Sequence, residues 1–148
     1  MMLKFVAQHP KQFIQLILAF LWVYQGLLPK LLFPSAFDIQ VWQFLGLEAH
    51  PATLFTRLSG CGEILFGCAF LFWQRNHYLH YLSIFGLLGL LILSAIINPD
   101  QLIAGFNPVI MNSAMAALSL LALQTYNPES TKPLNASLHE YNKMDSSV

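Results

Sequence analysis

Three long stretches of the chain contain no Asp, Glu, Lys or Arg, and they constrain the fold more than any other feature. They cover residues 12–29, 76–99 and 101–128, and their side chains are mostly apolar. A helix that crosses a membrane needs about 20 mostly apolar residues. Charged side chains make up 9% of the 148 residues, against about 25% in a typical soluble protein. The chain is therefore expected to be an integral membrane protein.

The apolar segments predict an all-α fold, an integral membrane four-helix transmembrane bundle that forms a single domain over residues 1–126. Asn98-Pro99 ends the third helix, and Asn107 followed by Pro108 suits the start of the fourth. The polar residues 127–148 are expected to form a disordered cytoplasmic tail. The predicted spans cover residues 12–29, 53–73, 78–97 and 108–126.

A cleaved signal peptide is the alternative interpretation of the first apolar segment. The segment is long for a signal peptide, and Pro34 would occupy the −3 position of the best available cleavage site, after Ala36. Retention of this segment as a membrane helix is therefore the favoured interpretation.

The connection between the first two spans predicts a short helix over residues 35–47. Pro34 precedes it, and Ser35 with Asp38 has the spacing of a capping box, although Asp replaces the usual Glu or Gln. Trp42 is a residue type that favours the headgroup level of a bilayer. We therefore expect an interfacial helix on the outer side of the membrane.

The positions of the basic residues predict the orientation of the bundle. Lys30 and Arg57 fall on one side, and five of the seven basic residues fall on the other: Lys4, Lys11, Arg75, Lys132 and Lys143. Because basic residues favour the cytoplasmic side, both termini are expected in the cytoplasm.

Polar residues of three spans are expected to converge on the outer half of the bundle. Glu63 lies ten residues into the second span, so it is about 15 Å deep at a rise of about 1.5 Å per residue. Gly60 and Gly67 share a broad helix sector with Arg57 and Glu63, and such glycines permit close helix packing. The cytoplasmic half is expected to be almost purely apolar. The candidate residues of this polar layer are Tyr24, Gln25, Lys30, Arg57, Glu63, Asn107 and Asn112.

Two interpretations of the polar layer stay open at this point. In the first, the layer is a structural clamp in which Glu63 is neutral or pairs with Arg57 or Lys30. In the second, it forms a small cavity, open to the outer face, that holds a polar head group or passes protons. Glu63 would then be the titrating group, because an ionisable side chain at membrane depth is normally paired or faces a cavity.

Several other functions are disfavoured by the sequence. A formal net charge of zero argues against a nucleic-acid binder. Cys61 and Cys68 are seven residues apart on one predicted helix, beyond the reach of a disulfide, and no Cys-x-x-Cys occurs. His77 and His80 are expected at the cytoplasmic edge, which does not suit haem ligation inside the bundle. No metal site is predicted.

Three motifs resemble the DoxX-like family of small bacterial membrane proteins. They are Trp-Val-Tyr-Gln-Gly-Leu-Leu-Pro-Lys-Leu-Leu-Phe-Pro over residues 22–34, Arg-Leu-Ser-Gly-x-x-Glu-x-x-x-Gly over residues 57–67, and Phe-Asn-Pro over residues 106–108 with Asn112. The resemblance extends over residues 15–125. It implies a four-helix protein of a bacterial inner membrane. The wider family takes its name from a subunit of a thiosulfate:quinone oxidoreductase. No cofactor is expected for this chain, and quinone is the one exception that the resemblance would allow.

The leading prediction is a small membrane protein without catalytic activity of its own. It would be an accessory subunit or a binder of a lipid-like or quinone-like molecule. The alternatives are a membrane subunit of a quinone-linked oxidoreductase and, less favoured, a small proton-coupled carrier. The expected partners are the lipid bilayer, a membrane or redox protein, and further copies of the chain in a homo-oligomer. Four short helices would need such an oligomer to form a full transporter.

Overall fold

The computed structural model describes residues 10–73, 76–102 and 108–124, and all the regular structure within these ranges is helical. Asn107 and the predicted tail, residues 127–148, lie outside the described residues. The elements are α2 (Pro10–Gly26), the π-helical turn η1 (Leu27–Leu32), α3 (Ala36–Phe44), α4 (Ala49–Phe72), α5 (His77–Ile97), the 3₁₀ turn η2 (Pro99–Leu102) and α6 (Pro108–Gln124).

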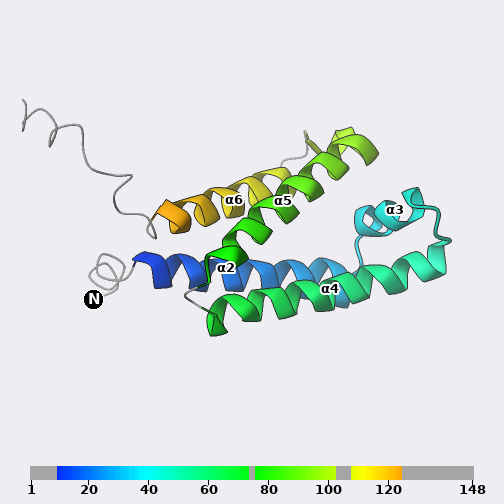
Figure 1. Ribbon diagram of the computed structural model, residues 1–148. Helices are drawn as coiled ribbons and strands as arrows, with labels where there is room; N and C mark the ends of the chain where they lie inside the picture. Colours follow the sequence, from blue (N-terminus) through cyan, green and yellow to red (C-terminus); the bar gives the residue numbers. More distant parts are fainter. Residues whose placement is uncertain (1–9, 74–75, 103–107, 125–148) are drawn as a thin grey trace, which may run out of the picture.

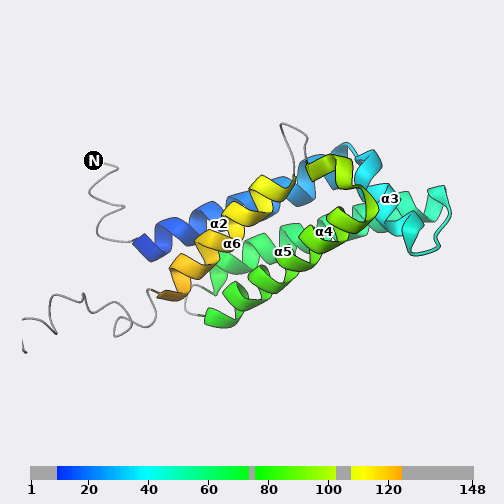
Figure 2. The same cartoon turned by 90° about the horizontal axis from the view of Figure 1, so that it is seen from above.

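The four long helices form two antiparallel pairs (Figure 1). α2 packs against α4, α5 packs against α6, and the two pairs meet where α2 contacts α6. Figure 2 shows the same helices from above, with α3 at one end of the bundle. α2 begins and α6 ends at the other end of the bundle.

Among the described residues, three helical segments are long and apolar enough to cross a membrane: Pro10–Leu32, Ala49–Phe72 and His77–Ile97. They contain 23, 24 and 21 residues, which at about 1.5 Å per residue matches a hydrocarbon core of about 30 Å. α6 is a shorter apolar helix. Many large apolar side chains on these helices are exposed, including Phe20, Leu65, Phe85 and Ile92. These properties are those of an integral membrane protein.

The first helix does not end at Pro29, as the sequence suggested, but continues through η1 to Leu32. Proline has no N–H and its ring clashes with the carbonyl four residues earlier, so it cannot continue a regular α-helix. A π turn spaces the backbone more widely, and prolines and π turns are both sites at which a helix bends without ending. The consequence is that Lys30 stays on a helical segment instead of entering a loop.

α2 and α4 pack backbone against backbone at two levels. A Cβ atom added to Gly26 would lie 2.4 Å from the carbonyl oxygen of Gly60, and one added to Gly60 would lie 2.6 Å from the carbonyl oxygen of Gly26. Seven residues along each helix, a Cβ atom on Gly67 would lie 2.9 Å from the carbonyl oxygen of Ala19. Small residues at heptad spacing thus set the close approach of these two helices.

The short helix predicted between the first two spans is present as α3. Ser35 is its N-cap and accepts a hydrogen bond of 3.1 Å from the backbone N–H of Asp38. Gly46 ends the helix with a φ of 94°, in a Schellman motif where the N–H groups of Gly46 and Leu47 donate to the carbonyls of Gln43 and Trp42. α3 packs along the first half of α4, where the rings of Trp42 and Phe55 lie 5.2 Å apart.

The remaining long helices lie close to the predicted spans. α4 begins at Ala49, four residues before the predicted start, because Pro51 is tolerated in its first turn. α5 ends at Ile97, directly before Asn98-Pro99, and Asn76 caps its first turn by accepting from the N–H of Tyr78.

Candidate functional site

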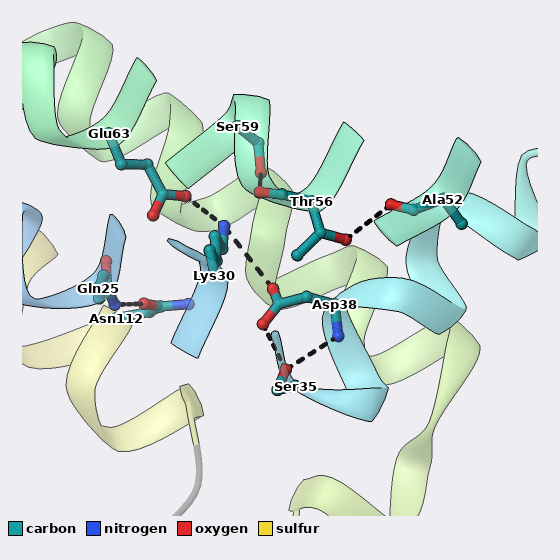
Figure 3. A network of polar contacts seen from close by, with 9 residues as sticks. All are labelled: Gln25, Lys30, Ser35, Asp38, Ala52, Thr56, Ser59, Glu63 and Asn112. Atoms are coloured by element: carbon teal, nitrogen blue, oxygen red, sulfur yellow. Dashed lines mark hydrogen bonds and ion pairs between the residues drawn. The ribbon is translucent and has the colours of Figure 1, made fainter. Parts of the chain in front are cut away.

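Lys30 lies between two carboxylates at the end of the bundle that carries α3 (Figure 3). Its Nζ donates a hydrogen bond to Oε1 of Glu63 on α4, and it forms an ion pair of 3.7 Å with Oδ1 of Asp38 on α3. The three side chains retain exposed fractions of 11%, 13% and 19% for Lys30, Glu63 and Asp38. We refer to these three residues as the Lys30 cluster. It joins three separate helical segments and is open to the surroundings at its edge.

Local structure fixes the positions of Lys30 and Asp38 in the Lys30 cluster. The π turn places the Cβ atom of Lys30 close to Gly60, only 2.9 Å from where a Cβ on that glycine would be. Asp38 is held by Ser35, whose hydroxyl donates to Oδ2 of Asp38 over 2.5 Å. The N–H of Ser35 in turn donates to the carbonyl of Pro29 over 2.8 Å, so α3 is anchored directly to η1. The cluster is therefore built on helix backbone and not on a loose loop.

The Lys30 cluster contains more acceptors than donors. Two carboxylates share one ammonium group, and Oε2 of Glu63 is buried with no hydrogen-bond partner among the described residues. A buried acceptor without a partner is unfavourable, because its interaction with water has been lost and not replaced. The cluster can therefore take a further hydrogen-bond donor.

A second polar pair adjoins the Lys30 cluster. Nε2 of Gln25 on α2 donates a hydrogen bond of 2.8 Å to Oδ1 of Asn112 on α6. Both residues are buried, with 8% and 5% exposed. In Figure 3 the amide oxygen of Gln25 points toward Glu63, and its amide nitrogen points away, to Asn112. This oxygen also has no hydrogen-bond partner among the described residues.

The structure brings together four of the seven candidates from the sequence, as the pairs Lys30–Glu63 and Gln25–Asn112. Tyr24 is 43% exposed and Arg57 is also exposed, so neither lies in the cluster. Arg57 follows the fully buried Thr56, and one residue along an α-helix turns the side chain by about 100° away from the buried face. The packed face of α4 is therefore narrower than the helix sector expected from the sequence, and it does not include Arg57. Asn107 lies outside the described residues.

Sequence reasoning missed Asp38 as a member of the site. It was interpreted as a helix-capping residue, which it is, but its carboxylate also faces Lys30. The feature of the sequence that could have indicated this contact is Pro34, which lies between Lys30 and Asp38 where the chain changes direction. Because α3 folds back from η1, a carboxylate in its first turn comes within reach of a lysine in the last turn of the preceding helix.

The other end of the bundle is less apolar than the sequence suggested. Nε1 of Trp22 donates to Oγ of Ser83 over 3.3 Å, and Oγ of Ser119 donates to the same oxygen over 3.2 Å. Both serines are completely buried. His80, expected at the membrane edge, is also completely buried and its ring lies 5.2 Å from that of Phe70. Single serines and a histidine within apolar stretches give no periodic signal, which explains why sequence reasoning overlooked them.

Metal and thiol chemistry have no evident centre in this part of the molecule. No group of three or more His, Cys, Asp or Glu side chains is arranged to hold a metal ion within residues 10–73, 76–102 and 108–124. Cys61 is exposed and Cys68 is partly buried, and both are free thiols.

Comparison with known families gives a match to the DoxX-like family over residues 19–120, which is more than half of the chain. The matched range contains Lys30, Asp38, Glu63, Gln25 and Asn112. Comparisons with curated proteins and with solved structures give no match.

Proposed function

We propose that this chain, which belongs to the DoxX-like family, is a small membrane protein that binds the polar head of a lipid-like or quinone-like molecule at the Lys30 cluster. The observation that carries the proposal is Oε2 of Glu63, a buried carboxylate oxygen with no partner among the described residues, beside a lysine that is already shared. The chain would act by holding this molecule, alone or as an accessory subunit, and not by catalysis.

Three features support binding over a purely structural clamp. Lys30 is the one cation that contacts both Glu63 and Asp38 among the described residues, so negative charge exceeds positive charge when both carboxylates are ionised. A clamp is also most stable when every polar atom is satisfied, and here Oε2 of Glu63 is not. Finally, the three side chains keep exposed fractions between 11% and 19%, so the Lys30 cluster lies close to the surface of the bundle.

The proposed setting is a bacterial inner membrane crossed four times, with α6 as the fourth span and both termini in the cytoplasm. α2 begins and α6 ends at the same end of the bundle, which supports an even number of crossings. The bias of basic residues supports the cytoplasmic placement of that end. α3 would then lie at the outer interface, where a lipid-like molecule has access to the Lys30 cluster from the membrane.

The proposal can be tested by identifying what the protein retains on purification. The wild type and Glu63→Gln would be extracted gently from native membrane and analysed by native mass spectrometry, followed by extraction of lipids and quinones. We expect the wild type to retain a defined amphiphile in about stoichiometric amount. We expect Glu63→Gln to lose most of it, because the amide preserves the shape of the side chain and removes its charge.

Glu48→Gln is the matched control, because Glu48 is exposed at the start of α4, away from the Lys30 cluster. It should retain the molecule as the wild type does. Equal retention by Glu63→Gln would contradict the proposal. Retained quinone together with a redox protein would identify the chain as a subunit of a quinone-linked oxidoreductase. A protein partner without any amphiphile would indicate a purely accessory role.

A further inference from the structure

We infer that the molecule bound at the Lys30 cluster presents a hydrogen-bond donor, a hydroxyl or a primary ammonium group, to Glu63 and Gln25 together. This inference rests on the proposed function and specifies the chemistry of the head group. It follows from two buried acceptor atoms, Oε2 of Glu63 and Oε1 of Gln25, that both lack a partner among the described residues.

The two acceptors belong to one place in the bundle. In Figure 3 the amide oxygen of Gln25 is on the side of its side chain that faces the Glu63 carboxylate. α2 lies against α4 at this level of the bundle, because a Cβ atom added to Gly26 would lie 3.1 Å from the Cβ of Glu63. Gln25 is more than nine-tenths buried and its amide nitrogen is fixed on Asn112, so its oxygen is held in place.

Lys30 supplies the ammonium donors of the site, and two carboxylates already face them. Lys30 has three N–H groups, and its ammonium faces Glu63 on one side and Asp38 on the other. A head group that only accepts hydrogen bonds would leave both unpartnered oxygens unsatisfied. A head group that donates would satisfy them, and it would also meet a cluster in which two carboxylates face one lysine. The site therefore favours a neutral or cationic donor over an acceptor of the same size.

Two pairs of probes isolate this property, and each pair represents one source of the donor. The first is a decyl-substituted benzoquinone in its reduced form, which carries two hydroxyls, and in its oxidised form, which carries none. The second is phosphatidylethanolamine, whose ammonium has N–H groups, and phosphatidylcholine, whose trimethylammonium has none. Binding to the full chain in detergent would be measured for each probe by displacement or native mass spectrometry, with the quinone pair handled without oxygen.

We expect the donor member of at least one pair to bind about tenfold or more tightly than its partner, because a lost hydrogen bond leaves buried acceptors unpaired. Which pair shows the preference identifies the source. Glu63→Gln and Gln25→Leu should each reduce the preference to about twofold or less. Gln12→Leu, an exposed position on the same helix as Gln25, should preserve it. Thermal unfolding of each variant distinguishes loss of the site from loss of the fold.

The inference and the proposed function fail in different ways. If the probes bind and neither pair shows a preference, the inference is wrong and the proposed function stands. If no probe binds to the wild type, both are wrong. A nuclear magnetic resonance measurement that finds the Gln25 amide group donating to Glu63 in the unliganded protein would also overturn the inference, because no acceptor would then be left over.

Discussion

Lys30 is the residue on which most of the polar chemistry of this bundle depends. A charged side chain at membrane depth is unfavourable unless it is paired or reaches water. Lys30 and Glu63 are paired with each other, and Asp38 adds a second contact to Lys30 at 3.7 Å. Arg57, the other basic residue on this side, is exposed and takes no part. The pairing of Glu63 with Lys30 instead of Arg57 can be tested by stability.

Removal of Lys30 should destabilise the protein far more than removal of Arg57. Lys30→Met leaves Glu63 without its cation, and we expect a loss of about 2 kcal/mol in the free energy of unfolding. The loss should be smaller when Glu63→Gln is already present, so the two changes are not additive. Arg57→Met should change stability by less than about 0.5 kcal/mol. Unfolding of the four variants of the cycle in detergent measures both effects. Equal losses for Lys30→Met and Arg57→Met would contradict the assigned pair.

Ser83 should be important for stability although it carries no charge. Ser83→Ala would leave the indole N–H of Trp22 buried without an acceptor, at a cost of about 1–3 kcal/mol. Ser83→Ala should cost less in a chain that already carries Trp22→Phe, since no indole N–H is then left unpaired. Ser113→Ala, at an exposed position on α6, is the control and should be nearly neutral. A neutral Ser83→Ala, measured by thermal unfolding, would show that the hydrogen bond does not contribute.

At the scale of the helices, the pairing of α2 with α4 depends on residues that lack side chains. In a bilayer the hydrophobic effect does not drive helices together, so close packing and interhelical hydrogen bonds must do so. Gly26 meets Gly60 and Ala19 meets Gly67, which brings the two backbones into contact. The same contact brings Lys30 to α4. Helix packing and the geometry of the Lys30 cluster therefore depend on the same glycines.

Two neighbouring glycines of α4 should respond oppositely to alanine. Gly60→Ala places a methyl group 2.6 Å from the carbonyl oxygen of Gly26, so we expect a loss of about 1–3 kcal/mol. A Cβ atom on Gly62 meets nothing within 4 Å, so Gly62→Ala should be neutral or stabilise the helix by up to about 1 kcal/mol. Thermal unfolding in detergent measures both. If the two variants lose the same stability, the helices do not cross at Gly60.

The helices could be predicted from the sequence much better than the faces they turn toward each other. Uncharged apolar stretches and the pairs Asn98-Pro99 and Ser35 with Asp38 locate elements, because the signals are local. Membrane helices are apolar on the lipid side and on the packed side, so hydrophobic periodicity does not distinguish these faces. Arg57 was placed inside the bundle for this reason. The small residues at heptad spacing were the better guide to the packed face.

At the scale of the whole molecule, polar residues lie at two levels of the bundle. The Lys30 cluster and the pair Gln25–Asn112 lie toward the end with α3, and Trp22 with its two serines lies toward the end where α2 begins. Leu18, Leu87 and Met115 belong to the apolar core, which also includes the ring of Trp22. Only the first level could be predicted, because it contains charges. The second consists of neutral residues whose partners are fixed by tertiary packing.

The proposed topology makes an experimental prediction for the chain as a whole. A reporter fused after Gln124 should give a cytoplasmic signal, and one inserted at Gly46, in the exposed turn between α3 and α4, should give a periplasmic signal. A fusion inserted at Asn98 should match the signal at Gly46, because α5 and α6 are antiparallel. Identical signals from the reporters at Gln124 and Gly46 would contradict an even number of crossings.

The number of residues in the π turn at Leu27–Leu32 determines where Lys30 lies relative to Glu63. A π turn holds one residue more per hydrogen-bonded ring than an α-helical turn, and Pro29 within it has no N–H to donate to an α-helical hydrogen bond. If another residue replaced Pro29, the turn would be free to tighten, and Lys30 would rotate about the helix axis relative to Glu63. In an alignment of related chains, a gap or an insertion at these six positions would therefore change the direction in which the lysine points around the helix axis. This holds even where the lysine itself is retained.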